Sequence, residues 1–231
     1  MERPYIICHM VQSVDGKVTG DFLYSPRCKS ATEVYCEINR EYSHNGFICG
    51  RVTMESSFTG GFRPDLSQYP AIESNEDFTE VELSEFYAVS FDPKGKVGWS
   101  DPFIDDEDPG YDMAQVIEVV SNKVDRRYLG YLKSLGIPYI FAGDDEIDVP
   151  LALSKLKSLG IDTLLLEGGS VINGYFQRAD CIDELSLVVA PVVSQGDGKP
   201  LFDNACISDF SLKETVIYDD CVLWLNYEKL K

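Results

Sequence analysis

Apolar residues occur along this chain in two alternating patterns, short continuous runs and longer runs with helical spacing. Continuous runs are typical of strands buried on both faces, whereas spacing of three and four residues is typical of helices. The short runs predict strands at 4–11, 47–50, 86–91, 116–120, 139–142, 163–166 and 184–191, and a final hairpin at about 212–218 and 222–228. The helical spacing predicts helices at 30–44, 124–135, 150–160 and 170–179.

Strands that alternate with helices predict an α/β fold with a mostly parallel sheet and helices on both faces. The closing hairpin around Asp219-Asp220 makes this sheet mixed. The stretch at about 60–115 interrupts the pattern with several prolines and an acidic knot, Asp105–Asp108, which we interpret as a solvated loop. The 231 residues fit one large domain or two small ones, and a single domain over 1–231 is the simplest interpretation.

The net negative charge of the chain argues against binding partners that are themselves negatively charged. Its 39 acidic and 20 basic residues give a formal net charge of −19, which disfavours nucleic acid and anionic membranes. There is no basic leader before the first predicted strand, and no apolar run approaches the roughly 20 residues that cross a bilayer. Seven cysteines without a C-x-x-C pair indicate reduced thiols, so we expect a cytoplasmic protein.

Histidine is scarce, which limits the chemistry available to the chain. With His9 and His44 alone, neither a histidine-based metal site nor a Ser-His-Asp triad is well supported, and we expect no metal. His9 lies inside a predicted strand, and we interpret it as a packed residue rather than a base.

The most informative segment runs from Thr163 to Phe176. A buried strand ends at Glu167, Gly168 and Gly169 follow, and Ser170 opens a helix. Glycines let a ligand approach the backbone closely, and the free N–H groups at a helix N-terminus favour an anion. The segment is neither a Walker loop nor a Rossmann fingerprint, and the alternative is a turn in which the glycines serve geometry alone.

Three turns are expected at one edge of the sheet. They span 13–17, 50–54 and 167–174, and each follows the carboxyl end of a predicted strand. Ligands of open α/β folds bind at that edge. Because two of these turns open into helices and can hold phosphates, the pattern suits a dinucleotide better than a mononucleotide.

The same turns resemble a known family. Ser13–Lys17, Ile48–Thr53, Glu167–Ser170 and Asp183–Pro191 occur in the order found in the reductase domain of the bifunctional riboflavin-biosynthesis deaminase-reductase. The resemblance implies a three-layer, dihydrofolate reductase-like fold and an NADPH-dependent reductase that forms a homodimer. A zinc deaminase signature is absent from the sequence.

The resemblance also implies roles for individual residues. NADPH would be held by two turns, comprising Gly168, Gly169, Ser170, Val171, Ile172 and Gly174 in one, and Gly50, Arg51 and Thr53 in the other. Glu167 and Asp15 are the candidate catalytic residues, and they would contact the substrate together with Ser13. Two alternatives stay open: Asp15 is a simple turn former, and Thr53 is a helix N-cap.

The chain departs from the family pattern in its phosphate ligands. Glu41 stands where the family has an arginine for the ribose phosphate, with Arg40 beside it. The family's Asp-x-Pro after the second cofactor turn is also absent, and Arg63 is a candidate replacement ligand. Lys94 and Lys96 are candidates for the 2′-phosphate of NADPH, which needs a cationic or hydroxyl pocket.

These features predict hydride transfer from NADPH to a polar pyrimidine-like or pterin-like substrate, with Glu167, Asp15 or water supplying the proton. A dihydrofolate reductase-like reduction of a C=N bond is the enzymatic alternative. A non-catalytic paralogue that binds NADP or a partner is the other. Residues 62–112, with 14 acidic and 3 basic residues and a net charge of −11, would then serve the partner.

Overall fold

The computed structural model describes residues 2–196 and 198–230, and the chain divides into two compact units. Unit 1 contains residues 2–4 and His44–Asp162, and unit 2 contains Tyr5–Ser43 and the described residues from Thr163 onward. Each unit is therefore built from stretches that are far apart in sequence.

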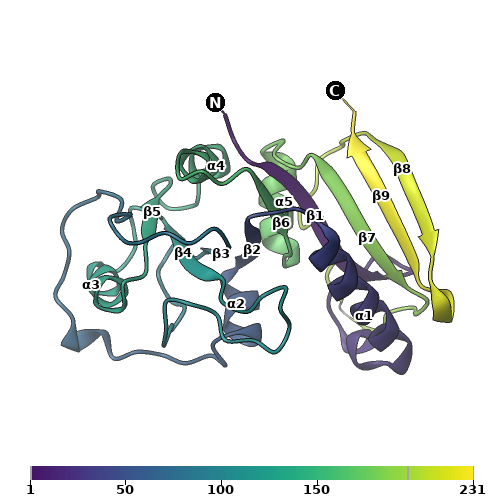
Figure 1. The fold of residues 1–231 in the computed structure, drawn as a ribbon, viewed down its shortest axis with the longest axis horizontal. Coiled ribbons are helices and arrows are strands. Elements are labelled where there is room, and N and C mark those ends of the chain that lie inside the picture. Colours follow the sequence, from purple (N-terminus) through teal and green to yellow (C-terminus); the bar gives the residue numbers. More distant parts are fainter. Residues whose placement is uncertain (1, 197, 231) are drawn as a thin grey trace. The chain divides into compact units, whose positions relative to one another are not determined.

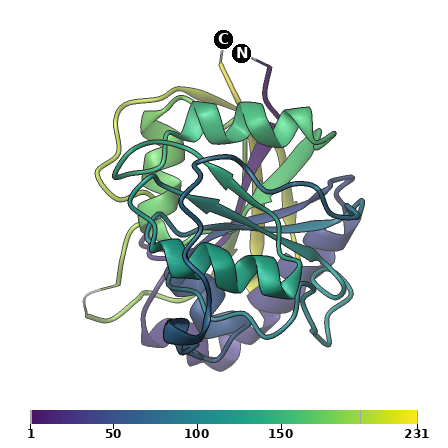
Figure 2. The ribbon, with the colours of Figure 1, turned by 90° about the vertical axis from the view of Figure 1, so that its left-hand side faces the viewer.

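Unit 1 has a parallel sheet of four neighbouring strands, in the order β5-β4-β3-β2. They are β2 (Gly46–Gly50), β3 (Tyr87–Phe91), β4 (Gln115–Val120) and β5 (Tyr139–Phe141). The helices are α2 (Arg51–Ser57), α3 (Arg126–Leu135) and α4 (Val149–Ser158), with a short 3-10 helix η2 (Leu66–Gln68). Figure 2 shows the strands of this unit between α4 above and α3 below.

Local sequence explains where the helices of unit 1 begin and end. The side chain of Asp148 accepts a hydrogen bond from the N–H of Leu151, which confirms the predicted cap of α4. Asp125 caps α3 in the same way, and α3 ends at Gly136, whose φ of 72° is a left-handed conformation that glycine adopts without strain. The irregular stretch is confirmed, since η2 and β3 are the regular elements described between Ser57 and Gln115.

Unit 2 has five neighbouring strands, in the order β6-β1-β7-β9-β8. They are β6 (Thr163–Leu166), β1 (Tyr5–Ser13), β7 (Glu184–Ala190), β9 (Leu223–Lys229) and β8 (Phe210–Ile217). The first three are parallel, and β9 pairs antiparallel with both β7 and β8. The C-terminal hairpin, closed by the 3-10 helix η3 (Asp219–Cys221), therefore makes the sheet mixed as predicted (Figure 1).

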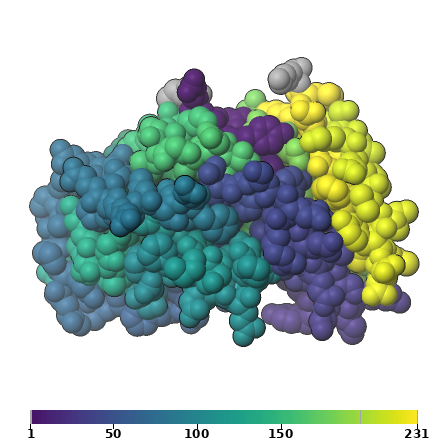
Figure 3. Space-filling model, viewed as in Figure 1, coloured from purple at the N-terminus to yellow at the C-terminus, as the bar shows by residue number. Residues whose placement is uncertain are grey.

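Helix α1 (Pro26–Glu41) covers one face of this sheet, and α5 (Ser170–Arg178) follows β6. Ala31 and Ile38 of α1 pack with Val188 of β7 and Val222 in a buried cluster. In the space-filling view the surface of α1 lies beside that of the hairpin (Figure 3). The helix begins four residues before the predicted boundary, because Ser25 caps it and Pro26 occupies its first turn.

Two interpretations of reactive residues are confirmed. His9 is fully buried, stacks on Tyr35, and has its ring nitrogens 2.9 Å from Ser186 Oγ and 3.0 Å from the Tyr35 carbonyl, so it is a packed residue. All seven cysteines are free thiols. No helix within the described residues is long and apolar enough to span a membrane.

Candidate active site

Glu167 lies directly after β6, and its side chain is held in place. The residue is 8 % exposed, and Asn39 of α1 donates a hydrogen bond of 2.8 Å from Nδ2 to its Oε1. Asn39 is itself buried. Because the amide fixes one carboxylate oxygen, the orientation of Glu167 is set by packing rather than by solvent.

The backbone conformation after Glu167 favours glycine, and the space beside it is tight. Gly168 has a φ of 92°, and a Cβ there would lie 3.0 Å from Sδ and Cε of Met10. The peptide between Gly168 and Gly169 is cis. Gly169 is the N-cap of α5 and has no side chain to cap it, so the first N–H groups of the helix are free of a side-chain partner.

Ser170 brings a further donor to this helix terminus. The residue is 2 % exposed, and its Oγ has no hydrogen-bond partner among the described residues. Buried hydroxyl groups are usually paired, so an unpaired one beside uncapped N–H groups fits an anionic ligand. Val171 is exposed and Ile172 is buried, so the first turn of α5 has one open side and one packed side.

At Gly174 the backbone of another segment packs so closely that only glycine fits. A Cβ at this position would lie 2.0 Å from the carbonyl oxygen of Asp203, in the segment that crosses α5. The N–H of Asp203 donates to the carbonyl of Ser170 at 3.0 Å, which fixes that segment on the helix. Close packing accounts for this glycine without a ligand.

The turn after β1 is held by hydrogen bonds to Asp15. Its Oδ1 accepts from the N–H of Ser194 at 2.8 Å and from Ser13 Oγ at 2.7 Å. These bonds, that from Ser194 first, hold the pKa of the exposed Asp15 carboxyl below its usual value. Asp15 is therefore ionised at neutral pH, and it connects two loops of unit 2.

Strand register separates the two candidate catalytic residues of unit 2. Leu166, the last residue of β6, pairs with Cys8 of β1. Ser13 lies five residues farther along β1, roughly 16 Å at about 3.3 Å per residue. Glu167 and Asp15 therefore lie at different points along the edge of this sheet and do not meet at one atom.

The third turn lies in unit 1, where Gly50 is the N-cap of α2 and has no side-chain cap. The helix begins at Arg51, so the alternative in which Thr53 is the N-cap is wrong. Arg51 reaches Glu55 at 2.8 Å and Arg63 reaches it at 2.9 Å. Burial raises the pKa of Glu55, but hydrogen bonds from the two arginines outweigh it, so the pKa lies below its usual value.

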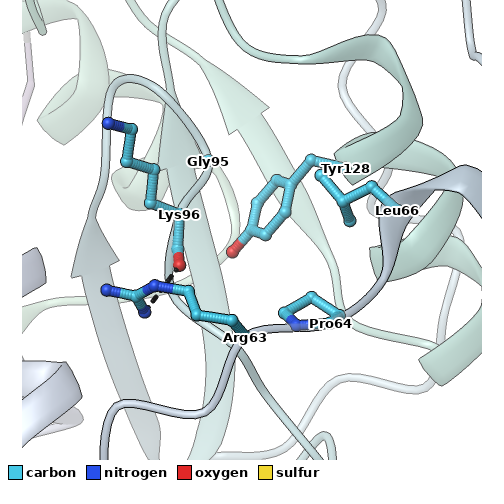
Figure 4. A pocket seen from close by; sticks show the side chains of 6 residues that line it. All are labelled: Arg63, Pro64, Leu66, Gly95, Lys96 and Tyr128. Atoms are coloured by element: carbon cyan, nitrogen blue, oxygen red, sulfur yellow. Dashed lines mark hydrogen bonds between the residues drawn. The ribbon is translucent and has the colours of Figure 1, made fainter.

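A pocket of about 310 Å³ lies in unit 1, and it brings together two of the predicted phosphate ligands. It is lined by Arg63, Pro64, Leu66, Gly95, Lys96 and Tyr128. Arg63 Nη1 donates to the Lys96 carbonyl at 3.1 Å, as Figure 4 shows, and the Tyr128 hydroxyl is buried and donates to the Val97 carbonyl at 2.9 Å. Lys94 is exposed and does not line the pocket. Arg40 is exposed in the last turn of α1, in unit 2.

Two buried carboxyl groups hold the loop that forms one side of this pocket. Asp92 accepts hydrogen bonds from the N–H groups of Lys96 and Val97, and burial raises its pKa. Glu118 of β4 accepts from Trp99 Nε1 at 2.6 Å and from the Tyr128 hydroxyl at 3.2 Å. Burial, reinforced by the charge of Asp92, raises the pKa of Glu118 well above its usual value.

Sequence reasoning missed three residues that shape these sites. Asn39 had a detectable signal, since it is a poor helix former that lies four residues after Tyr35 on the buried face of a helix. Glu118 had one too, as a lone charge inside an apolar strand. Met10 had none, because its contact with Gly168 depends on the pairing of β1 with β6.

The sequence is similar to a known protein family and to a characterised reductase. Residues 111–223 match the family model of the RibD C-terminal domain. The chain is 28 % identical over 211 residues to the 2,5-diamino-6-ribosylamino-4(3H)-pyrimidinone 5′-phosphate reductase of Aquifex aeolicus, covering 87 % of this chain and 82 % of that one.

Solved structures share the fold at low sequence identity. A pyrimidine reductase-like protein from Corynebacterium diphtheriae matches 99 % of this chain and 92 % of its own, with a TM-score of 0.71 and 14 % identity. Acinetobacter baumannii RibD matches 99 % of this chain and 59 % of its own, with a TM-score of 0.65 and 19 % identity. The predicted fold class is confirmed, and the chain is similar in sequence to a reductase of the family that its motifs resemble.

Proposed function

We propose that this chain is an NADPH-dependent reductase of riboflavin biosynthesis that acts on a ribosylaminopyrimidine 5′-phosphate. The observation that carries the proposal is the turn of Glu167, Gly168, Gly169 and Ser170, in which a positioned carboxylate adjoins an uncapped helix N-terminus. The name of the Aquifex relative supplies the substrate class. We further expect a single cytoplasmic reductase domain that forms a homodimer.

The residues of unit 2 fit the pyrophosphate of a dinucleotide. The uncapped N–H groups at the start of α5 and the unpaired hydroxyl of Ser170 are donors for phosphate oxygens. Gly168 is buried and Gly169 is half-buried, and neither has a side chain that would block a phosphate. Among the predicted cofactor residues, Val171 and Ile172 would contribute backbone N–H groups, while Gly174 would support the site through packing.

Unit 1 has a second arrangement that fits the phosphate groups of a nucleotide. Gly50, Arg51 and Thr53 form a second uncapped helix start, and two arginines share one glutamate there. Two guanidinium groups and one carboxylate leave one net positive charge for an anion. We propose Arg63 and Lys96, at the pocket shown in Figure 4, as the ligands of the 2′-phosphate.

When bound, NADPH supplies a hydride for the electrophilic carbon of the substrate. The chain must orient the substrate and deliver one proton to complete the reduction. We propose that Glu167, held by Asn39, positions the substrate and passes this proton, directly or through water. Asp15 is ionised and pinned to Ser194, so with Ser13 we assign it to binding a more distant part of the substrate.

The first test is titration of the purified protein with NADPH and NADH, followed by NADPH oxidation with 2,5-diamino-6-ribosylamino-4(3H)-pyrimidinone 5′-phosphate. Selective NADPH binding and turnover support the proposal. Turnover with dihydrofolate instead would favour C=N reduction, and binding without turnover on either substrate would favour a non-catalytic paralogue. A folded sample that binds neither nucleotide contradicts the proposal.

A further inference from the structure

Two buried acidic side chains contact residues that line the pocket of Arg63 and Lys96, and the proposed function uses neither of them. Asp92 directly follows β3 and is 1 % exposed, and Glu118 of β4 is fully buried. Both lie in unit 1, as the pocket does. A buried carboxyl group is costly to keep ionised unless it is paired or hydrogen-bonded, so the hydrogen bonds of each group indicate its charge.

Asp92 holds the backbone that presents Lys96 to the pocket. Its Oδ2 accepts hydrogen bonds from the N–H groups of Lys96 and Val97, the latter at 2.8 Å. Gly95, which lines the pocket, has a φ of 63°, and a Cβ there would lie 2.3 Å from the ring of Tyr128. Because two N–H donors meet one oxygen of Asp92, these bonds favour its ionised form. Asp92 therefore places one negative charge beside the pocket.

The hydrogen bonds of Glu118 fit a neutral acid. Its Oε1 lies 2.6 Å from Trp99 Nε1 and 3.2 Å from the Tyr128 hydroxyl. The same hydroxyl also donates to the Val97 carbonyl at 2.9 Å, and its one hydrogen cannot serve both acceptors at full strength. A protonated Glu118 removes this conflict, because it can donate to the Tyr128 oxygen while the hydroxyl donates to Val97.

The surroundings of the pair leave the charge of Glu118 uncompensated. Among the described residues, the titratable groups that face Glu118 are Asp92, Tyr128 and Tyr131 of α3, and Tyr139, its neighbour in β5. Burial raises the pKa of each of these tyrosines, so they are neutral. Arg51 of α2 faces Asp92 and favours its ionised form, although burial raises the pKa of Asp92. The side chains of Lys94 and Lys96, on the loop above the pair, are exposed.

The proton on Glu118 decides the net charge at the pocket. Five charged side chains line the pocket or are connected to it by hydrogen bonds and ion pairs, three positive and two negative, namely Arg51, Arg63, Lys96, Glu55 and Asp92. One positive charge is left when Glu118 is neutral, and none is left when it is ionised.

We infer that Glu118 is a specificity-determining residue of this pocket: as a neutral acid it preserves the positive charge that favours a 2′-phosphate, and on ionisation it cancels that charge. Glu118 acts through Tyr128 and the field of its own charge, without touching the nucleotide. The inference rests on the proposed function, which assigns the 2′-phosphate to Arg63 and Lys96.

The ratio of the affinities for NADPH and NADH tests the inference, because the two nucleotides differ only in the 2′-phosphate. Fluorescence titration of the wild type and of Glu118→Gln with both nucleotides, at several pH values from 6.5 to 9, gives this ratio for each protein. Glu118 has a raised pKa and ionises as the pH rises. At pH 6.5 the two proteins should have the same ratio. By pH 9 the ratio of the wild type should have fallen about tenfold relative to Glu118→Gln, the order expected of one unit charge within roughly 10 Å of a phosphate.

The matched control is Glu107→Gln, which removes a carboxylate from an exposed loop of the same unit and should follow the wild type at every pH. Partial unfolding of a variant lowers both affinities alike and leaves the ratio unchanged, and ionisation of the 2′-phosphate itself affects all three proteins equally. Ratios that run parallel in the wild type and Glu118→Gln would overturn the inference and leave the proposed function standing. A folded protein that binds neither nucleotide at any pH contradicts both.

Discussion

The clearest physical prediction concerns Glu118, a carboxyl group buried in the middle of a strand. The residue is fully buried, and its hydrogen bonds come from the neutral donors Trp99 and Tyr128. The nearby Asp92 is also buried and adds negative charge when ionised. Glu118→Gln keeps the shape of the side chain and an acceptor for both donors, and it removes the group that titrates.

The sign of the effect follows from the raised pKa of Glu118 in the folded protein. A carboxyl group with a raised folded pKa keeps full stability below its unfolded pKa, and that stability is lost as the pH rises toward the folded pKa. One proton corresponds to about 1.4 kcal/mol per pH unit, so between pH 5.5 and 7.5 the free energy of unfolding of the wild type should fall relative to Glu118→Gln, with a slope of at most about 1.4 kcal/mol per pH unit. Urea denaturation at several pH values measures this difference, and Trp99 is a local fluorescence reporter.

The matched control is Glu107→Gln, which removes the same charge from an exposed loop. Its difference from the wild type should stay nearly constant with pH, because the substitution leaves the buried carboxyl groups in place. If the curves of wild type and Glu118→Gln were parallel across this range, the carboxyl would not be held neutral by burial, and the reasoning would be refuted.

Three further predictions address the site. Glu167→Gln should retain NADPH binding by fluorescence titration and lose turnover, whereas loss of both would make the residue structural. The double variant Arg63→Ala with Lys96→Ala should weaken NADPH binding by about 10- to 100-fold, the range expected for charge-assisted hydrogen bonds, and leave NADH binding nearly unchanged. The control is Lys94→Ala, at an exposed residue outside the pocket. Equal losses of affinity for both nucleotides would contradict the assignment of Arg63 and Lys96 to the 2′-phosphate. Gly174→Ala should destabilise the protein by about 1–3 kcal/mol in thermal unfolding, because its Cβ would collide with the Asp203 carbonyl, and an unchanged melting temperature would show that this segment moves freely.

Much of the fold could be predicted from local patterns, because the responsible interactions are local. Asp148 followed by Pro150 gave the start of α4, and Gly136 gave the end of α3. Short apolar runs located β3 and β4, which are buried along their whole length. The start of α1 was placed four residues late, because the capping role of Ser25 precedes the apolar spacing of the helix.

The candidate site was predictable only in part. The Glu167–Ser170 turn could be recognised because a strand, two glycines and a helix start are consecutive in the chain. Which side chains of the site contact one another, and how far apart Glu167 and Asp15 lie, could not be predicted, because both depend on strand register. The sequence offers both Asp15 and Glu167 as proton donors. In the structure the N–H of Ser194 donates a hydrogen bond to Asp15 and lowers the pKa of its carboxyl, so Asp15 is ionised and held in place.

The sequence by itself determined the alternation of strands and helices, the acidic character of the chain and the identity of the glycine-rich turn, because each depends on neighbouring residues or on composition. The tertiary structure decided which distant groups meet: Asn39 with Glu167, Arg63 with Lys96, and Met10 with Gly168. It also decided that the Glu118 side chain is buried away from solvent. The physical reason is that hydrogen bonding, desolvation and close packing act through space, between residues that the linear order of the chain does not bring together.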